Sequence, residues 1–272
     1  MLMTSVLCFA AHVVGEETPT RPHVSMSVAA SVDQIAPGRP FDVICTLDVP
    51  TGWHIYWKDP GASGAATEIT MHMPPGFVSA PTRFPRPKRL PESSGVINAL
   101  EGRVHFAIRV GPPASLQIGQ TIDLAIKADW FVCKKVCFLG AGEVVLNVRV
   151  AKEAGKPTSQ AALLHGIPQP IGSRDGTSAV VHAGLLRVVG QRDPAGPPGF
   201  LPIACPGVSW GTPRASLHEN RFVMDVPVSY DQENGLQTPP RIQGLLTFGS
   251  LESDPAWVID LPFGEQSDGE TQ

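Results

Sequence analysis

Hydrophobic and polar residues alternate with a period of two through most of the chain, in short segments separated by proline and glycine. The pattern is clearest in VSMSVAASV at 24–32 and FDVICTLDV at 41–49, which the stretch APGRP separates. Period two places successive side chains on opposite faces of a strand, whereas proline and glycine favour turns. The pattern therefore predicts antiparallel strands joined by turns.

The region 23–150 holds about seven or eight such segments, the number expected of an immunoglobulin-like sandwich. Besides the two segments already quoted, alternation is found at 53–57, 66–73, 102–110, 121–132 and 142–150. We therefore predict an all-β fold in which residues 23–150 form an immunoglobulin-like β-sandwich.

The pattern changes between residues 151 and 170, where AKEAGKPTSQAALLHGIPQP lacks alternation. Thr158 or Ser159 is a suitable N-cap for a short helix through Leu164 that Gly166 and Pro168 would end. Alternation returns after residue 171, and 272 residues suffice for two domains. We predict a helical linker at 151–170, a second, smaller β-sandwich-like domain at 171–264 with turns at DPAGPPG and QENG, and a disordered polar tail at 265–272.

Residues 1–22 resemble a secretory signal, with an apolar run at 6–14 and small residues before Glu16. The run is not preceded by lysine or arginine, so the basic part of such a signal is missing. No later apolar stretch reaches the roughly 18 residues that span a bilayer. The segment predicts export from the cytoplasm, and its removal would take away Cys8 and leave four cysteines.

Composition and motifs exclude several classes of function. The chain is 42% hydrophobic and 17% charged with a net charge of -4, so it has no basic surplus for a nucleic acid partner. The sequence also lacks the metalloprotease H-E-x-x-H, a phosphate loop and a dinucleotide fingerprint. Metalloprotease, kinase and dehydrogenase functions are without support.

Cys133 and Cys137 lie close together between two predicted strands, in ADWFVCKKVCFLGAGEVVLNV. A structural disulfide between these cysteines would add little stability, because closing so short a loop stabilises the fold by only about 2 kcal/mol. A reactive thiol pair is supported by Lys134 and Lys135, whose positive charge favours the nucleophilic thiolate. Exposed turns also commonly contain lysine, so both interpretations remain open. A zinc site would need two further ligands at similar spacing, and we expect no bound metal.

Aromatic residues flank the cysteine pair and have two possible roles. Trp130, Phe131 and Phe138 form either an apolar collar that limits oxidant access to the sulfurs or part of a hairpin core, and for Trp130 the core is favoured. A second aromatic group lies in GWHIYWKDPG at 52–61. There, alternation puts Trp53, Ile55 and Trp57 on one face and His54 and Tyr56 on the other.

Two further groups have simple structural interpretations. Met71 and Met73 share one face of their predicted strand and His72 the other, which favours core methionines over a copper site. Cys45 lies in an alternating strand and is expected to be a buried free thiol. A disulfide from Cys45 to Cys205 would have to cross the two predicted domains and is disfavoured.

The motifs GWHIYWKDPG, PPGF, FPRPKRLP and ADWFVCKKVC follow one another in an order that resembles a known family. The chain resembles the N-terminal periplasmic domain of the thiol:disulfide interchange protein DsbD, and more closely the ScsB-like copper-sensitivity suppressor branch. The resemblance covers 24–150 well and the remainder more loosely. It implies an immunoglobulin-like redox domain in which Cys133 and Cys137 are the catalytic pair.

The resemblance also implies partners and a surrounding site. Electrons would come from a membrane-embedded DsbD-like donor or a thioredoxin-like domain on another chain and pass to oxidised periplasmic proteins. Trp130, Phe131, Lys134, Lys135, Phe138 and Tyr56 are the residues expected around the pair. Family members often carry an aromatic cap before the dipeptide EG, where this chain has Leu100 in GVINALEG. The family analogy favours Cys137 as the attacking thiol.

We therefore predict a periplasmic thiol:disulfide oxidoreductase component that needs no bound cofactor. Two alternatives remain. One is a non-enzymatic extracytoplasmic binding module with a structural disulfide, which would resist mild reductants. The other is a copper-handling protein that uses Cys133, Cys137 and nearby histidine or methionine.

Overall fold

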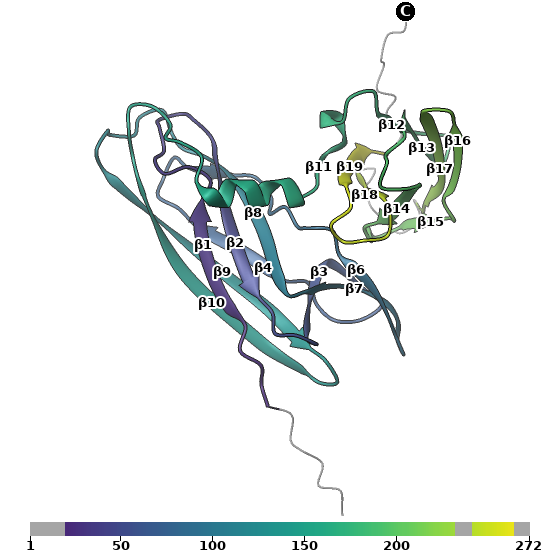
Figure 1. Cartoon of the computed structure of the whole chain (residues 1–272), viewed down its shortest axis with the longest axis horizontal. Coiled ribbons are helices and arrows are strands. Elements are labelled where there is room, and N and C mark those ends of the chain that lie inside the picture. The colour runs from purple at the N-terminus through teal and green to yellow at the C-terminus, as the bar shows by residue number, and fades with distance from the viewer. Residues whose placement is uncertain (1–19, 232–240, 264–272) are drawn as a thin grey trace, which may run out of the picture.

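The computed structural model describes residues 20–231 and 241–263, and almost all of their regular structure is β-strand. Most of the signal-like segment, the QENG turn and the polar tail lie outside these residues. Two groups of sheets follow one another along the chain, which we call the N-terminal β region (25–149) and the C-terminal β region (169–262) (Figure 1). The prediction of an all-β, immunoglobulin-like fold is confirmed.

The N-terminal β region contains two sheets with a common core. One has the strand order β1-β2-β8-β5, and the other has the order β10-β9-β3-β7-β6, with β4 paired to β9. The strands are β1 (Ser25–Ala30), β2 (Phe41–Asp48), β3 (His54–Gly61), β4 (Glu68–His72), β5 (Val78–Ser79), β6 (Lys88–Glu92), β7 (Gly95–Glu101), β8 (Arg103–Gly111), β9 (Thr121–Cys133) and β10 (Cys137–Arg149). All the predicted strands are present, and β5, β6 and β7 are additional.

The core between these two sheets consists of the apolar positions that alternation places inward. Trp57, Phe106 and Leu124 are fully buried there, and Cys45 packs among them as a free thiol, as predicted. Burial raises the pKa of the Cys45 thiol to about 12, because the thiolate would be poorly solvated. This cysteine therefore stays protonated and serves packing rather than exchange.

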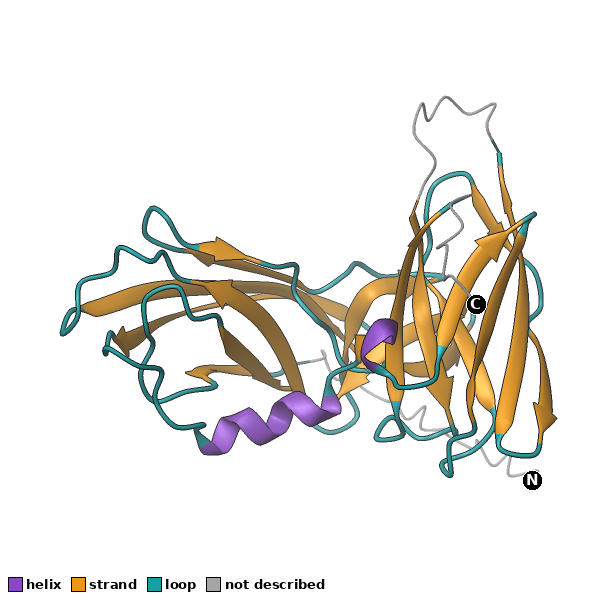
Figure 2. Ribbon diagram, turned by 90° about the horizontal axis from the view of Figure 1, so that it is seen from above, coloured by secondary structure: helices purple, strands orange, loops and turns teal. Residues whose placement is uncertain are grey.

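The segment predicted to be a helical linker forms a 3-10 helix, η1 (Ser159–Gly166), that lies against β1 and β2. It is the longer of the two purple helices in Figure 2. Thr158 is at its N-cap position, but its hydroxyl donates to the Ala30 carbonyl at 2.8 Å instead of capping the helix. The predicted helix ends as expected, because Gly166 is its last residue. The hydroxyl bond ties the start of this segment to β1.

The C-terminal β region contains two further sheets, with the orders β11-β19-β18-β14 and β12-β13-β17-β15, and β16 pairs with β17. The elements are β11 (Gln169–Pro170), η2 (Ile171–Ser173), β12 (Ser178–His182), β13 (Leu185–Gln191), β14 (Pro198–Pro202), β15 (Val208–Trp210), β16 (Arg214–His218), β17 (Arg221–Tyr230), β18 (Arg241–Phe248) and β19 (Ala256–Pro262). The apolar stretches 178–190 and 215–230 each contain a hairpin. In the first of these hairpins, Ala183 and Gly184 connect β12 to β13. Both residues have positive φ, as a tight hairpin turn requires.

Contacts join the two β regions directly. The Arg86 guanidinium donates to the carbonyls of Phe248 at 2.7 Å and Gly249 at 2.9 Å, and the Asp59 carboxylate accepts from the Ala204 N–H at 2.6 Å. Leu201 from β14 also belongs to the N-terminal core cluster. The independent folding of 23–150 and 171–264 as separate domains, with 151–170 as linker, stays a prediction.

Candidate functional site

The cysteine pair lies at the tip of the long β9–β10 hairpin, which Figure 1 shows as the longest pair of strands. Cys133 is the last residue of β9 and Cys137 the first of β10, and they face each other in register with their Cα atoms 4.1 Å apart. The two sulfurs form a disulfide. Lys134, Lys135 and Val136 make the turn, which closes with a bond from the Lys134 N–H to the Val136 carbonyl.

The two sulfurs have different surroundings. Cys133 is 3% exposed and packs with Tyr56, Ile97 and Ala99, whereas Cys137 is exposed. Leu90 from β6 is partly buried against the same cluster. In a reduced pair, Cys137 is thus the thiol that a partner can reach, and Cys133 is the shielded one.

Of the predicted neighbours, Tyr56 is the one that shares a buried cluster with Cys133. Its side chain is almost fully buried in the cluster with Cys133. Gly64, with φ +92°, lies against the Tyr56 ring, and a side chain at this position would collide with the ring. Burial and the nearby Glu92 carboxylate raise the pKa of the Tyr56 hydroxyl, so it stays protonated at neutral pH.

The three aromatic residues around the pair lie on two faces of the sheet. Trp130 and Phe138 point into the core between the sheets, where the Phe138 ring lies 6.0 Å from that of Trp53. Phe131 is two residues before Cys133 and therefore shares the outer face with the disulfide. Only Phe131 of the three is on the sulfurs' side, so Trp130 and Phe138 act as core residues here.

The structure also places the two lysines of the turn and the leucine that precedes the EG dipeptide. Lys134 and Lys135 are exposed, and the Lys134 ammonium reaches the turn at Gly52. Leu100 is buried in the core between the sheets, on the opposite face from Ala99, so it does not cover the disulfide. The segment before EG is strand β7, not a loop.

Met71 and Met73 pack on the core as predicted, with His72 exposed on the other face. Within the described residues, no group of three or more His, Cys, Asp or Glu side chains is arranged to hold a metal ion. Cys205 is a free cysteine, so the disfavoured Cys45–Cys205 disulfide does not form. The parts of the chain that the structure describes also include no helix long and apolar enough to cross a membrane.

Four further residues lie at the site without having been predicted to do so: His54, Leu90, Ile97 and Ala99. His54 is directly opposite Cys133 on β3, and the other three come from the β6–β7 hairpin that covers the buried sulfur. The alternating pattern placed His54 on the same face of its strand as Tyr56. This was the one sequence signal that His54 lies at the site. The hairpin gave none, because its strands do not alternate.

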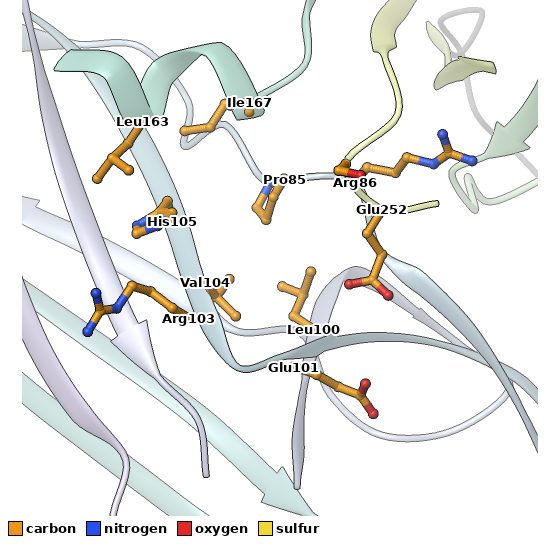
Figure 3. A pocket seen from close by; sticks show the side chains of 12 residues that line it. Pro85, Arg86, Leu100, Glu101, Arg103, Val104, His105, Leu163, Ile167 and Glu252 are labelled. Atoms are coloured by element: carbon orange, nitrogen blue, oxygen red, sulfur yellow. The ribbon is translucent and has the colours of Figure 1, made fainter. Parts of the chain in front are cut away.

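A cavity of about 320 Å³ lies away from the disulfide, where the two β regions meet η1 (Figure 3). Leu100, Leu163 and Ile167 supply apolar surface, and two of the charged side chains at its rim bind other parts of the protein. Arg103 pairs with Asp48 at 2.7 Å, and Arg86 binds the backbone carbonyls of the C-terminal region. These two arginines therefore serve the fold and are not free to orient a substrate.

The fold and the hairpin disulfide define an immunoglobulin-like domain with a half-exposed cysteine pair. Residues 25–149 match the family model described as thiol:disulfide interchange protein DsbD, N-terminal. The match supports a thiol:disulfide interchange domain. None of the curated proteins matches the chain at a significant level.

Among solved structures, the chain is similar to the N-terminal periplasmic domain of ScsB from Proteus mirabilis. The TM-score is 0.55 at 17% identity, covering 92% of this chain and 96% of that one. This similarity of fold extends over both β regions. The Escherichia coli chaperone DraB (TM-score 0.27, 9% identity, covering 88% of this chain and 98% of that one) and the Bacillus cereus pilin subunit BcpA (0.29, 12%, 89% and 67%) resemble it far less.

Proposed function

We propose that this protein passes electrons from a membrane-embedded DsbD-like donor, or a thioredoxin-like domain on another chain, to oxidised proteins in the periplasm through Cys133 and Cys137. The observation that carries the proposal is the asymmetry of the disulfide, in which Cys137 is exposed at a hairpin tip and Cys133 is buried. This arrangement, in a segment that matches the DsbD N-terminal family model, suits exchange better than stapling, because the closed loop is too short to add much stability.

The exposed sulfur defines the order of the reaction. The Cys137 thiolate of the reduced pair attacks the target's disulfide, and Cys133 then displaces the target from the mixed disulfide. Lys134 and Lys135 lie between the two cysteines and favour the thiolate through their positive charge. The chemistry needs no bound cofactor.

An apolar surface beside the disulfide suits it for docking a redox partner. Leu139 is 61% exposed and lies opposite the partly exposed Phe131, on the same face as the two cysteines. Val136 adds a third exposed apolar side chain in the turn. A partner protein that binds to these residues would bring its own sulfurs next to Cys137.

Leu139→Lys is expected to slow exchange with a protein donor while leaving exchange with dithiothreitol unchanged. The charge would disturb apolar docking, whereas the small dithiol needs no docking surface. A reduced thioredoxin serves as the protein donor, and the rate of disulfide reduction is followed by thiol alkylation. We expect a decrease of about tenfold, which corresponds to roughly 1.4 kcal/mol of docking energy.

Val145→Lys is the matched control, because Val145 is 53% exposed on the same face of β10 but six residues from Leu139. At about 3.3 Å per residue it lies roughly 20 Å further along the strand. The proposed docking surface is wrong if both variants slow the reaction equally. The proposed function itself is wrong if the wild-type disulfide accepts electrons from neither thioredoxin nor dithiothreitol.

A further inference from the structure

A polar row crosses four adjacent strands of the sheet that carries the disulfide. Cys137 on β10 faces Cys133 on β9, Cys133 faces His54 on β3, and His54 faces Glu101 on β7. Directly opposed residues of antiparallel strands have their Cβ atoms about 5 Å apart and project to the same face. The imidazole is therefore the immediate neighbour of the buried cysteine.

His54 is buried and retains an unused hydrogen-bonding atom. Its side chain is 6% exposed, and its ring meets the Tyr56 ring edge-on at 5.1 Å between centroids. Its Nε2 is inaccessible to solvent and makes no hydrogen bond to any described residue. A buried polar atom without a partner costs about 1–3 kcal/mol, so its retention here calls for a use.

Charged groups surround His54 on the side away from the sulfurs. Burial lowers the pKa of the imidazole, and the carboxylates of Glu92 and Glu101 partly offset this. Glu101 is bound by Lys88 at 2.9 Å, and its side chain is 34% exposed at the rim of the cavity in Figure 3. The imidazole is thus neutral near pH 7 and lies between a buried sulfur and a carboxylate that reaches solvent.

We propose that His54 accepts the proton of the Cys133 thiol in the second step of exchange, and so turns a shielded thiol into the nucleophile that releases the target. This inference rests on the proposed function. Burial among Tyr56, Ile97 and Ala99 disfavours a bare thiolate on Cys133, so this step needs a local base. Cys137 needs none, because water reaches it.

The bonds and electrons balance as follows. Cys137 sulfur loses its proton to water and attacks the target disulfide, forming a mixed disulfide, and the first target sulfur leaves and takes a proton from water. Cys133 gives its proton to Nε2 of His54 while its sulfur attacks Cys137 sulfur. The bond from Cys137 to the target breaks, and the second target sulfur leaves and takes the proton from the imidazolium. The pair loses two electrons, and the target gains two thiols.

The test follows the reduced protein as it reacts with glutathione disulfide, quenched with acid and analysed by mass spectrometry. In the wild-type protein we expect little glutathionylated intermediate, because Cys133 resolves it quickly. In His54→Gln, the attack by Cys137 should keep its rate, whereas resolution at pH 7 should slow by about tenfold or more and the adduct should accumulate. The rate of resolution in the variant should also rise with pH more steeply than in the wild type.

His105→Gln is the matched control. His105 is another partly buried histidine whose pKa is lowered by burial, but it lies on β8 in the other sheet, hydrogen-bonded to Thr46 at 2.9 Å. This variant should resolve the adduct like the wild type. Thermal unfolding of each oxidised variant checks that both are folded.

Equal rates and pH profiles of resolution in wild type and His54→Gln would overturn the inference while leaving the proposed function intact. Failure of the wild-type pair to react at all would instead overturn the proposed function. If His54→Gln does not fold, NMR of the wild-type imidazole nitrogens decides. Nε2 should shift when the pair is reduced, as it accepts the thiol proton in a hydrogen bond, and an unchanged signal would contradict the proposal.

Discussion

Cys137→Ser is expected to abolish electron transfer through the hairpin pair, by about three orders of magnitude or more, because it removes the exposed thiol of that pair. The buried Cys133 that remains cannot attack a protein disulfide. The fold should persist, since the lost five-residue loop contributes only about 2 kcal/mol. Transfer is measured as the rate at which reduced protein reduces an oxidised protein target.

Cys133→Ser should behave differently, because the exposed Cys137 can still attack while the resolving thiol is missing. We expect it to accumulate a stable mixed disulfide with its target, which mass spectrometry detects. Cys205→Ser is the control, since Cys205 is a free cysteine remote in sequence from the pair. Undiminished transfer by Cys137→Ser would contradict the assignment of the exchange site to this pair.

Trp57→Ala is expected to be among the most destabilising single changes in the chain, lowering the free energy of unfolding by about 3–5 kcal/mol. The Trp57 side chain is fully buried between the two sheets of the N-terminal β region, and truncation leaves a large cavity. Chemical denaturation followed by fluorescence measures the loss. Trp57→Phe, which refills much of the space, should cost clearly less.

The same strand provides an internal contrast, because Trp57 points into the core while His54 and Tyr56 share the face of the disulfide. Trp57→Ala should therefore leave the reduction potential of the pair unchanged under conditions where the protein stays folded. If Trp57→Ala lowered the free energy of unfolding by less than about 1 kcal/mol, Trp57 would not be the core residue that its burial indicates.

The strands that sequence predicted are those whose residues alternate or that clear turn residues bound. β9 alternates through its whole length, and β2 is bounded by clear turn residues, so both were found. β6 is mostly exposed, and four consecutive residues of β7 are buried. Neither has a period of two, because β7 is covered on both faces and β6 on almost none. Their pairing is a tertiary effect that a local pattern does not record.

The candidate site was predictable where it depends on local sequence. The spacing of Cys133 and Cys137 between two strands located the hairpin tip, and the consecutive Trp130 and Phe131 had to point to opposite faces. His54 was not assignable, because its position opposite Cys133 depends on which residues of β3 and β9 are in register. Register between strands distant in sequence is set by packing across the whole sheet.

The reduction potential of the Cys133–Cys137 pair tests the central claim most directly. The oxidised protein is equilibrated with a graded series of reduced and oxidised glutathione or dithiothreitol, and alkylation with mass spectrometry assigns the sulfurs that respond. The account predicts a reversible potential between about -180 and -270 mV, the range of exchange proteins. A pair that stays oxidised until the protein unfolds, with a potential below about -300 mV, would mark a structural disulfide and contradict the account.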